Sequence, residues 1–426
     1  MNVKDLRLSI GFYEQELLYN ILPFWLKNCE DKENGGYVNC FTNDGSKLIS
    51  KDKYVWSQGR FLWLFSKMSG FERPFTKEMR AEFLRLAKQG RDFLVEHTFM
   101  DSEPFRCYFL LDEKGNPKYV EGFDRLDMSI YADGFVLDGL NAYAVAANDR
   151  ESYDIAKRLF DSVMWRFETY NYCTLPYPIS DDYTMHGFYM VRIHYCYNMY
   201  LAAKVFEPDI APRYLAKLKE SVDNSLKFFA DDEGNVREVV YRDGSRVDGI
   251  FGNHINPGHT LEEMWFMLHA ADLLEDDSYT EKLVKIIKRT LEIGWDKEYG
   301  GIYHFICTDG SIPIESDGDP KDEVIYKQLI GGWGDKLWWV HSEALYCLLL
   351  FSERTGDEEL KEWYDKIFDY VYSVFPNPDR EVREWVQIRT REGKPQEAVV
   401  ALPVKDPMHI ARNMLYILRL LYSLEN

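Results

Sequence analysis

The chain has 426 residues, of which 46% are hydrophobic and 29% are charged, a composition typical of a folded protein and not of a disordered one. Its 51 basic and 71 acidic residues give a formal net charge of −20, which argues against nucleic acid and anionic membranes as partners. No segment approaches the roughly 18 apolar residues of a membrane span, and the first residues lack a signal-peptide pattern. Seven cysteines without a Cys-x-x-Cys pair predict a reduced, cytoplasmic protein without a thiolate metal site.

Helical periodicity dominates the chain and predicts twelve helices. Short and long connections alternate between them, a pattern that indicates six helical hairpins. The predicted helices span 5–27, 55–70, 76–97, 130–147, 150–169, 184–206, 210–230, 259–275, 278–293, 336–355, 358–374 and 406–424.

The long connections contain glycine turns between apolar runs, such as Asn43-Asp44-Gly45 and Thr308-Asp309-Gly310. Glycine supplies the positive φ that tight turns need, so we expect small β-hairpins in these loops at one end of the helical body. The sequence thus predicts an all-α fold, an (α/α)6 barrel formed as a single domain over residues 1–426. An open superhelix of helical hairpins is the alternative.

Seven polar side chains lie near the start of every second predicted helix. In a ring of hairpins these helix N-termini would share one end of the barrel, where the long loops also gather and where function usually resides. The seven residues are Arg60, Tyr131, His186, His259, His341, Glu343 and His409.

The string NPGHTLEEMW, residues 256–265, is the most distinctive. Glu262 follows His259 by three residues, so it can share a helical face with that imidazole and orient it. A capping arrangement that involves Thr260 or Glu262 is an equally good interpretation. A metal site is less favoured, because one histidine and one glutamate supply half a coordination sphere at most.

Two further strings place aromatic rings beside these polar groups. Trp56 and Arg60 lie four residues apart on one helical face, where Arg60 either binds substrate or forms a structural ion pair. Trp338 and Trp339 precede His341 and Glu343, which are two residues apart and should not face the same way. The paired indoles are candidate sugar platforms or core residues.

Together these strings resemble the N-acylglucosamine 2-epimerase family. The resemblance runs in order through WSQGR (56–60), PGHTLE (257–262), KLWWVHSEA (336–344), EWVQIRTREGK (384–394) and HIAR (409–412). It implies an (α/α)6 barrel and a sugar 2-epimerase or an aldose–ketose isomerase of the mannose type. His259 and His409 would be the acid/base pair, with supporting or substrate-binding neighbours at Arg60, Tyr131, His186, Glu262 and Glu343. Trp56 and Trp339 are added as candidate substrate-binding rings.

Histidine suits this chemistry, because removing the C2 proton of an open-chain aldose gives an enediol and requires a base that titrates near neutrality. We expect no cofactor and no metal, a small sugar as ligand, and either a monomer or a homodimer. Valine at 340 and alanine at 411, where the N-acyl epimerases tend to have proline, favour the isomerase. The alternatives are a glycoside hydrolase that uses Glu262 and Glu343 as paired carboxylates, and a non-catalytic sugar-binding protein.

Overall fold

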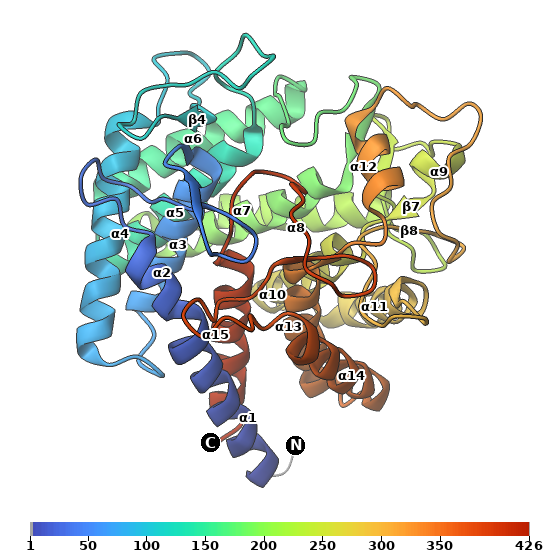
Figure 1. Ribbon diagram of the computed structural model, residues 1–426. Coiled ribbons are helices and arrows are strands. Elements are labelled where there is room, and N and C mark those ends of the chain that lie inside the picture. Colours follow the sequence, from blue (N-terminus) through green and yellow to red (C-terminus); the bar gives the residue numbers. More distant parts are fainter. Residues whose placement is uncertain (1–2, 426) are drawn as a thin grey trace.

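Six helices with few exposed positions form a closed inner ring in the computed structural model, which describes residues 3–425 (Figure 1). Each of these helices packs on the next, and the last returns to the first. The closed ring confirms the predicted (α/α)6 barrel and excludes the open superhelix. The inner helices are α3 (Val55–Ser69), α5 (Ile130–Ala147), α7 (His186–Phe206), α10 (Pro257–Leu274), α13 (Trp338–Thr355) and α15 (Met408–Ser423).

An outer helix covers each inner one. Five outer helices follow their inner partners after short links and form the predicted hairpins. Their buried residues recur at helical spacing while the other faces stay exposed, as expected for amphipathic helices on a core. These five are α4 (Lys77–His97), α6 (Arg150–Thr169), α8 (Ala211–Phe228), α11 (Thr280–Gly294) and α14 (Glu358–Val374).

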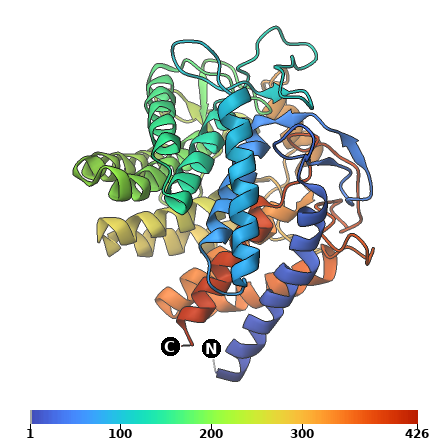
Figure 2. The same ribbon diagram turned by 90° about the vertical axis from the view of Figure 1, so that its left-hand side faces the viewer.

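The sixth pair joins the two ends of the chain. The N-terminal helix α1 (Val3–Gln15) packs along the C-terminal helix α15, and both chain ends lie at the same side of the molecule in Figures 1 and 2. The Tyr13 hydroxyl of α1 also hydrogen-bonds to that of Tyr364, which lies on the outer helix Glu358–Val374, at 2.7 Å. The barrel therefore contains five consecutive hairpins and one pair that closes the ring.

The first predicted helix, 5–27, is interrupted. A π-helical segment, η1 (Glu16–Ile21), separates α1 from α2 (Leu22–Asn28), and the Leu22 amide donates to the Leu17 carbonyl five residues back. Pro23 is the second residue of this last helix and has no amide to continue the α-helical pattern. The periodicity of apolar residues does not reveal such a local change of pitch.

The small sheets agree with the prediction in part. Strands β1 (Cys40–Phe41) and β2 (Leu48–Ser50) form a local hairpin, and single antiparallel bridges close other glycine turns, such as Leu111 with Pro117 and Arg389 with Pro395, where glycine has the expected positive φ. The other four sheets pair strands from successive long connections. They are β3 (Lys53–Tyr54) with β4 (Leu110–Leu111), β5 (Tyr183–Met185) with β6 (Val239–Tyr241), β7 (His254–Ile255) with β8 (Ile306–Cys307), and β9 (Lys336–Leu337) with β10 (Ile388–Arg389).

Four short helices were not predicted: the 3-10 turns η2 (Pro208–Ile210) and η3 (Asp277–Tyr279), and helices α9 (Gly249–Gly252) and α12 (Val324–Gly332). Helix α12 lies in a long connection at the same end of the barrel as the sheets (Figure 1). Among residues 3–425, no helix has the length and apolar character required to cross a membrane.

Two glycines set the closest helix contact in the ring. A Cβ added at Gly59 would lie 2.4 Å from the Phe135 backbone carbonyl, and one at Gly139 would lie 2.6 Å from the Gly59 carbonyl oxygen. Helices α3 and α5 therefore touch backbone to backbone. This contact places the Arg60 guanidinium 4.2 Å above the Phe135 ring.

Candidate active site

A cavity opens at the end of the barrel where the inner helices begin. It encloses about 1280 Å³ of atom-free space, including its mouth, and its floor comes from the first turns of the inner helices. Loop residues Val400, Ala401 and Leu402 and the α12 residues Ile325 and Gln328 complete its wall. Seven of the predicted site residues line this cavity: Trp56, Arg60, Tyr131, His259, Glu262, Trp339 and His409.

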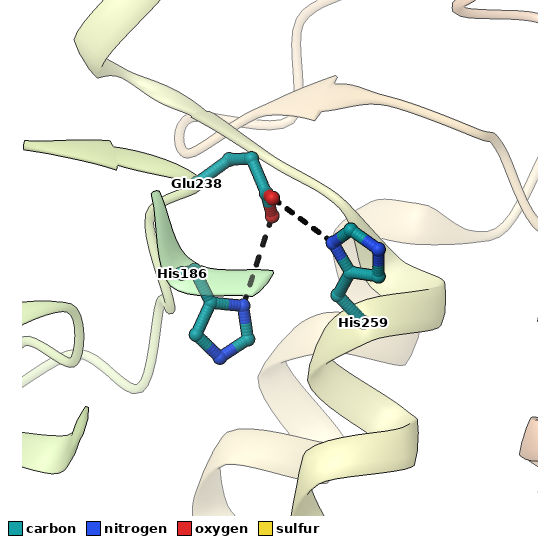
Figure 3. Close-up of side chains that lie close together, drawn as sticks. All are labelled: His186, Glu238 and His259. Carbon is teal, nitrogen blue, oxygen red and sulfur yellow. Dashed lines mark hydrogen bonds and ion pairs between the residues drawn. The ribbon is translucent and has the colours of Figure 1, made fainter. Parts of the chain in front are cut away.

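His259 lies in the first turn of α10. Asn256 caps this helix by accepting from the amides of Gly258 and His259 at 3.1 and 3.2 Å, and this fixes the backbone of the catalytic candidate. Its Nδ1 lies 2.9 Å from Glu238 Oε1, so Nε2 is the nitrogen available to the cavity. Its side chain is 21% exposed. The expected partner, Glu262, does not contact it, and Glu238 takes that role (Figure 3).

His186 does not reach the cavity. It is fully buried, and its Nε2 lies 2.8 Å from Glu263 while its Nδ1 lies 3.7 Å from Glu238. Burial lowers the pKa of this imidazole, but the two carboxylates outweigh that effect and raise it to about 10. The sequence placed His186 among the direct substrate contacts; the structure places it behind Glu238 instead.

His409 has a closely related environment. Its Nδ1 lies 2.6 Å from Glu343 Oε1, and Glu343 Oε2 accepts from the Trp265 indole at 2.8 Å. Glu343 also contacts the Arg412 guanidinium and is completely buried. Although burial raises its pKa, Arg412 and His409 together hold the pKa of Glu343 well below its usual range. Glu343, predicted to bind substrate, therefore lies beneath His409 and outside the cavity wall.

Glu262 belongs to the same cluster but has a different partner. Its carboxylate accepts from Arg412 at 2.6 Å and lies 3.9 Å from His409 Nδ1. Glu262 and Glu343 thus share one guanidinium. An inverting hydrolase instead needs two accessible carboxyl groups about 6.5–9.5 Å apart, so this arrangement disfavours the hydrolase alternative.

Trp339 lies between the two cavity histidines. Its ring centroid is 5.3 Å from that of His259 and 5.7 Å from that of His409. A Cβ at Gly258 would lie 2.5 Å from the indole, so glycine is required where α10 passes this ring. The indole can support the apolar face of a sugar between the two imidazoles.

Arg60 and Asp406 form an ion pair within the cavity wall. The Arg60 guanidinium also stacks 5.0 Å from the Trp56 ring centroid, and Asp406 accepts from the Met408 amide at the start of α15. The structural ion pair that the sequence offered as an alternative is therefore present. Because both partners line the cavity, the remaining Arg60 donors can still bind a substrate oxygen.

His341 lies outside the cavity. Its Nε2 accepts from the Ile302 amide at 2.9 Å, its Nδ1 lies 2.7 Å from the Leu337 carbonyl oxygen, and its ring stacks on Tyr370. Burial lowers its pKa to about 3, so it is a neutral structural residue. Neither His341 nor Glu343 faces the cavity, although the sequence favoured one of them.

Sequence reasoning missed several members of the site. Glu238 has only a weak signal, one of two charges in the β-rich string VREVVY, and Asp406 precedes the last helix as a capping residue would. His304 has no supporting pattern in the sequence, yet it lines the cavity, and its ring stacks on Phe305 at 3.8 Å. Burial lowers the pKa of His304 to about 3, with a further contribution from His259.

Two clusters in residues 3–425 contain donors that a metal ion could use: His186, Glu238 and His259, and Glu262, Glu343 and His409. In both clusters the donor atoms already bind one another, and the Arg412 guanidinium contacts the second. A guanidinium next to these carboxylates opposes a cation there by like-charge repulsion. The geometry therefore favours ion-paired imidazoles over a metal centre.

The cavity of this (α/α)6 barrel presents two imidazoles, each paired with a carboxylate, beside an arginine. This arrangement is suited to proton transfer on a small polar ligand. The sequence matches the N-acylglucosamine 2-epimerase (GlcNAc 2-epimerase) family over residues 35–409, and the chain belongs to this family.

Several known epimerases are similar to this chain along most of their length. The mouse (Mus musculus) N-acylglucosamine 2-epimerase is 27% identical over 420 residues, which cover 94% of this chain and 88% of that protein. The Ruminococcus albus cellobiose 2-epimerase is 24% identical, with coverage of 95% and 97%. The solved cellobiose 2-epimerase from Spirochaeta thermophila DSM 6192 has the same fold, with a TM-score of 0.78 at 20% identity and coverage of 100% and 99%.

Proposed function

We propose that this isomerase epimerises a sugar at C2, with His259 and His409 as its two acid/base groups. The observation that carries the proposal is the pair of imidazoles that line the cavity on either side of Trp339. Epimerisation needs a proton to leave one face of C2 and another to arrive on the opposite face. Aldose–ketose isomerisation can use one group.

The reaction begins with the open-chain sugar, whose C2–H is acidic because it adjoins the C1 carbonyl. One imidazole Nε2 takes this proton, and the electron pair of the C–H bond forms an enediolate with negative charge on O1. Arg60 is the cationic group of the cavity wall that can bind this oxygen. The other imidazole, protonated, returns a proton to C2 from the opposite face, and the carbonyl reforms.

Glu238 and Glu343 contribute through the histidines. Each carboxylate binds an Nδ1, fixes the ring orientation, and stabilises the imidazolium that forms during the cycle. Glu343 lies outside the cavity wall, and Glu238 reaches the wall with only 1% of its surface exposed, so we assign both a role through the histidines and not through sugar contact.

An N-acylated hexosamine, of the N-acylglucosamine and N-acylmannosamine type, is the first candidate substrate. The mouse relative carries that name at 27% identity, and Met190, Phe305 and Ile325 give the cavity apolar surface for an acyl methyl group. Val340 and Ala411, whose identities favoured an isomerase, are fully buried and do not line the cavity. They therefore give no support for that preference in the structure.

Proton NMR in D2O tests the reaction. N-acetylmannosamine, mannose, glucose and cellobiose are incubated separately with the protein, and we expect N-acetylglucosamine with deuterium at C2 from the first. Fructose from mannose would instead assign the isomerase reaction. If no sugar is converted and no C2 proton exchanges, the proton-transfer function is wrong.

We further propose that the whole chain acts as one catalytic domain in the cytoplasm. All seven cysteines are free thiols in the described structure, which supports a reducing compartment. Residues of one chain line the whole cavity, so we propose that each chain of a homodimer would carry a site. A sugar is the only partner proposed, and the net charge of −20 supports leaving out nucleic acid and anionic membranes.

A further inference from the structure

The two cavity histidines share one pattern of contacts. In each case the Nδ1 of the cavity imidazole lies beside a buried carboxylate, and that carboxylate lies beside a second buried basic group. For His409 the order is His409, Glu343 and Arg412. For His259 the order is His259, Glu238 and His186 (Figure 3). His186 occupies the position that an arginine holds in the other group.

We propose that His186 is a buried imidazolium that acts as the fixed counter-cation of Glu238, and that it thereby positions His259 and sets its affinity for protons. This inference rests on the proposed function, because it assumes that His259 exchanges a proton with the sugar. His186 itself does not touch substrate, so it is a positioning residue.

The surroundings of His186 favour a protonated ring. Glu263 Oε2 lies 2.8 Å from Nε2 and Glu238 Oε2 lies 3.7 Å from Nδ1, so a carboxylate oxygen lies near each ring nitrogen. A neutral imidazole has one N–H and one lone pair, and the lone pair would then lie near a buried carboxylate. The protonated form instead places a positive charge beside both carboxylates as an ion pair, and the pKa of about 10 agrees with this assignment.

The backbone holds this group in place. Strands β5 and β6 pair immediately beside it, and the His186 amide donates to the Glu238 carbonyl at 2.9 Å. Glu263 is in turn held by the Ser225 hydroxyl of α8. His186, Glu238 and Glu263 are each no more than 1% exposed. Water therefore does little to screen the charges.

Few other titratable groups face this cluster. Glu263 and Glu238 are the charged groups that act on His186, and Phe229 packs against its ring. Around Glu238 the neighbours are His186 and His259, with two tyrosines and two further histidines also within its field: Tyr131, Tyr177, His254 and His304. Burial raises the pKa of both tyrosines and lowers that of both these histidines, so all four are neutral. His186 is thus the only fixed cation beside Glu238 in the described part of the chain.

This arrangement suits a reversible epimerisation. In the forward direction one imidazole takes a proton and the other gives one, and the roles exchange in reverse. Two imidazoles that are each supported by a carboxylate beside a buried cation are matched for both directions. Without His186, the full charge of Glu238 would act on His259 and hold a proton there to higher pH.

Variants at His186 test the inference. His186→Gln removes the cation, and we expect kcat to fall by about 10-fold or more, KM to change by less than about threefold, and the acid limb of the kcat/KM profile to move up by about one pH unit. His186→Lys restores a cation and should return the acid limb close to its wild-type position. His341→Gln is the matched control, because it removes another completely buried histidine from the first turn of an inner helix.

Two results would overturn the assignment. An unchanged acid limb in His186→Gln, with a loss of kcat no larger than in His341→Gln, would make His186 merely structural. A rise in KM with unchanged kcat would make it a sugar contact. If the variants do not fold, 15N NMR of histidine-labelled wild-type protein decides: the His186 ring should stay protonated from about pH 6 to about pH 9, and titration in that interval would contradict the proposal. This NMR result does not depend on turnover, so it is separable from a failure of the epimerase function.

Discussion

The variant Glu343→Gln tests whether the Glu343 carboxylate supports His409 or binds the sugar directly. Glu343→Gln keeps the volume of the side chain but removes its charge, and it affects three contacts at once: His409 Nδ1 at 2.6 Å, the Trp265 indole at 2.8 Å and the Arg412 guanidinium. All three partners are donors. The new amide nitrogen is also a donor, so at least one of these contacts becomes unfavourable.

The expected fall in kcat follows from the loss of a hydrogen bond to a charged acceptor. A hydrogen bond to a charged group contributes about 1.5–3 kcal/mol, which corresponds to about a 10- to 150-fold fall in kcat if the bond to His409 is needed in the transition state. The stability loss should be less than the roughly 3–5 kcal/mol of a broken buried ion pair, because Arg412 keeps Glu262 at 2.6 Å.

Glu262→Gln is the matched comparison. It also removes one of the two carboxylates of Arg412, but it leaves the contact between His409 and Glu343 intact. We expect kcat in Glu343→Gln to be at least about 10-fold lower than in Glu262→Gln, a difference of about 1.4 kcal/mol. Steady-state kinetics with N-acetylmannosamine and thermal unfolding of both variants measure this. Equal losses of kcat, or a larger loss in Glu262→Gln, would refute the assignment of Glu343 as the support of His409.

Four other predictions concern the cavity and its chemistry. His259→Asn and His409→Asn should each lower turnover by at least about 100-fold, the lower end for general acid–base catalysis, while circular dichroism and melting temperature stay near wild type; near-normal turnover would remove that residue from the mechanism. Arg60→Lys keeps the charge but loses the planar donor group, so we expect a large loss of activity with little loss of stability; unfolding would instead make the pair with Asp406 structural. Incubation with EDTA should leave activity intact, and inactivation that zinc or manganese reverses would contradict a metal-free mechanism. His304→Phe keeps a ring that stacks on Phe305 but removes a neutral polar group from the cavity, so KM should rise by about 3- to 10-fold, the value of one uncharged hydrogen bond; an unchanged KM would exclude His304 from sugar binding.

The fold was largely predictable because its information is local. Apolar residues at helical spacing predicted all twelve long helices, and alternating connection lengths predicted five of their six pairs; the pair formed by the two chain ends has no connection to reveal it. The strands paired across successive segments were not predictable, since a strand of two or three residues has too little pattern to identify its partner. The π-helical turn before Pro23 also depends on a single missing amide.

The site was predictable in part for the same reason. A position near the start of an inner helix identified Arg60, Tyr131, His259 and His409 as cavity residues. Local spacing failed when a partner came from elsewhere in the chain. Glu262 was expected to pair with His259 three residues away, but Arg412, 150 residues further on, binds it instead. Glu238 reaches His259 from a different loop.

The four sheets that join successive connections bear on how this barrel could be rearranged. In each of them a strand next to the start of an inner helix is completed by a strand from the following connection. A single hairpin with its loops therefore does not contain both strands of its sheets. Excising it, or exchanging it between relatives, would leave a strand of the adjacent connection without its partner. The order of the helical hairpins along the chain can be changed more easily than their number, because α1 and α15 pack together and bring the two chain ends close. A circular permutant that links the old ends and opens the chain at Asn148–Asp149, far from the sheets, should keep every strand pair and the complete cavity.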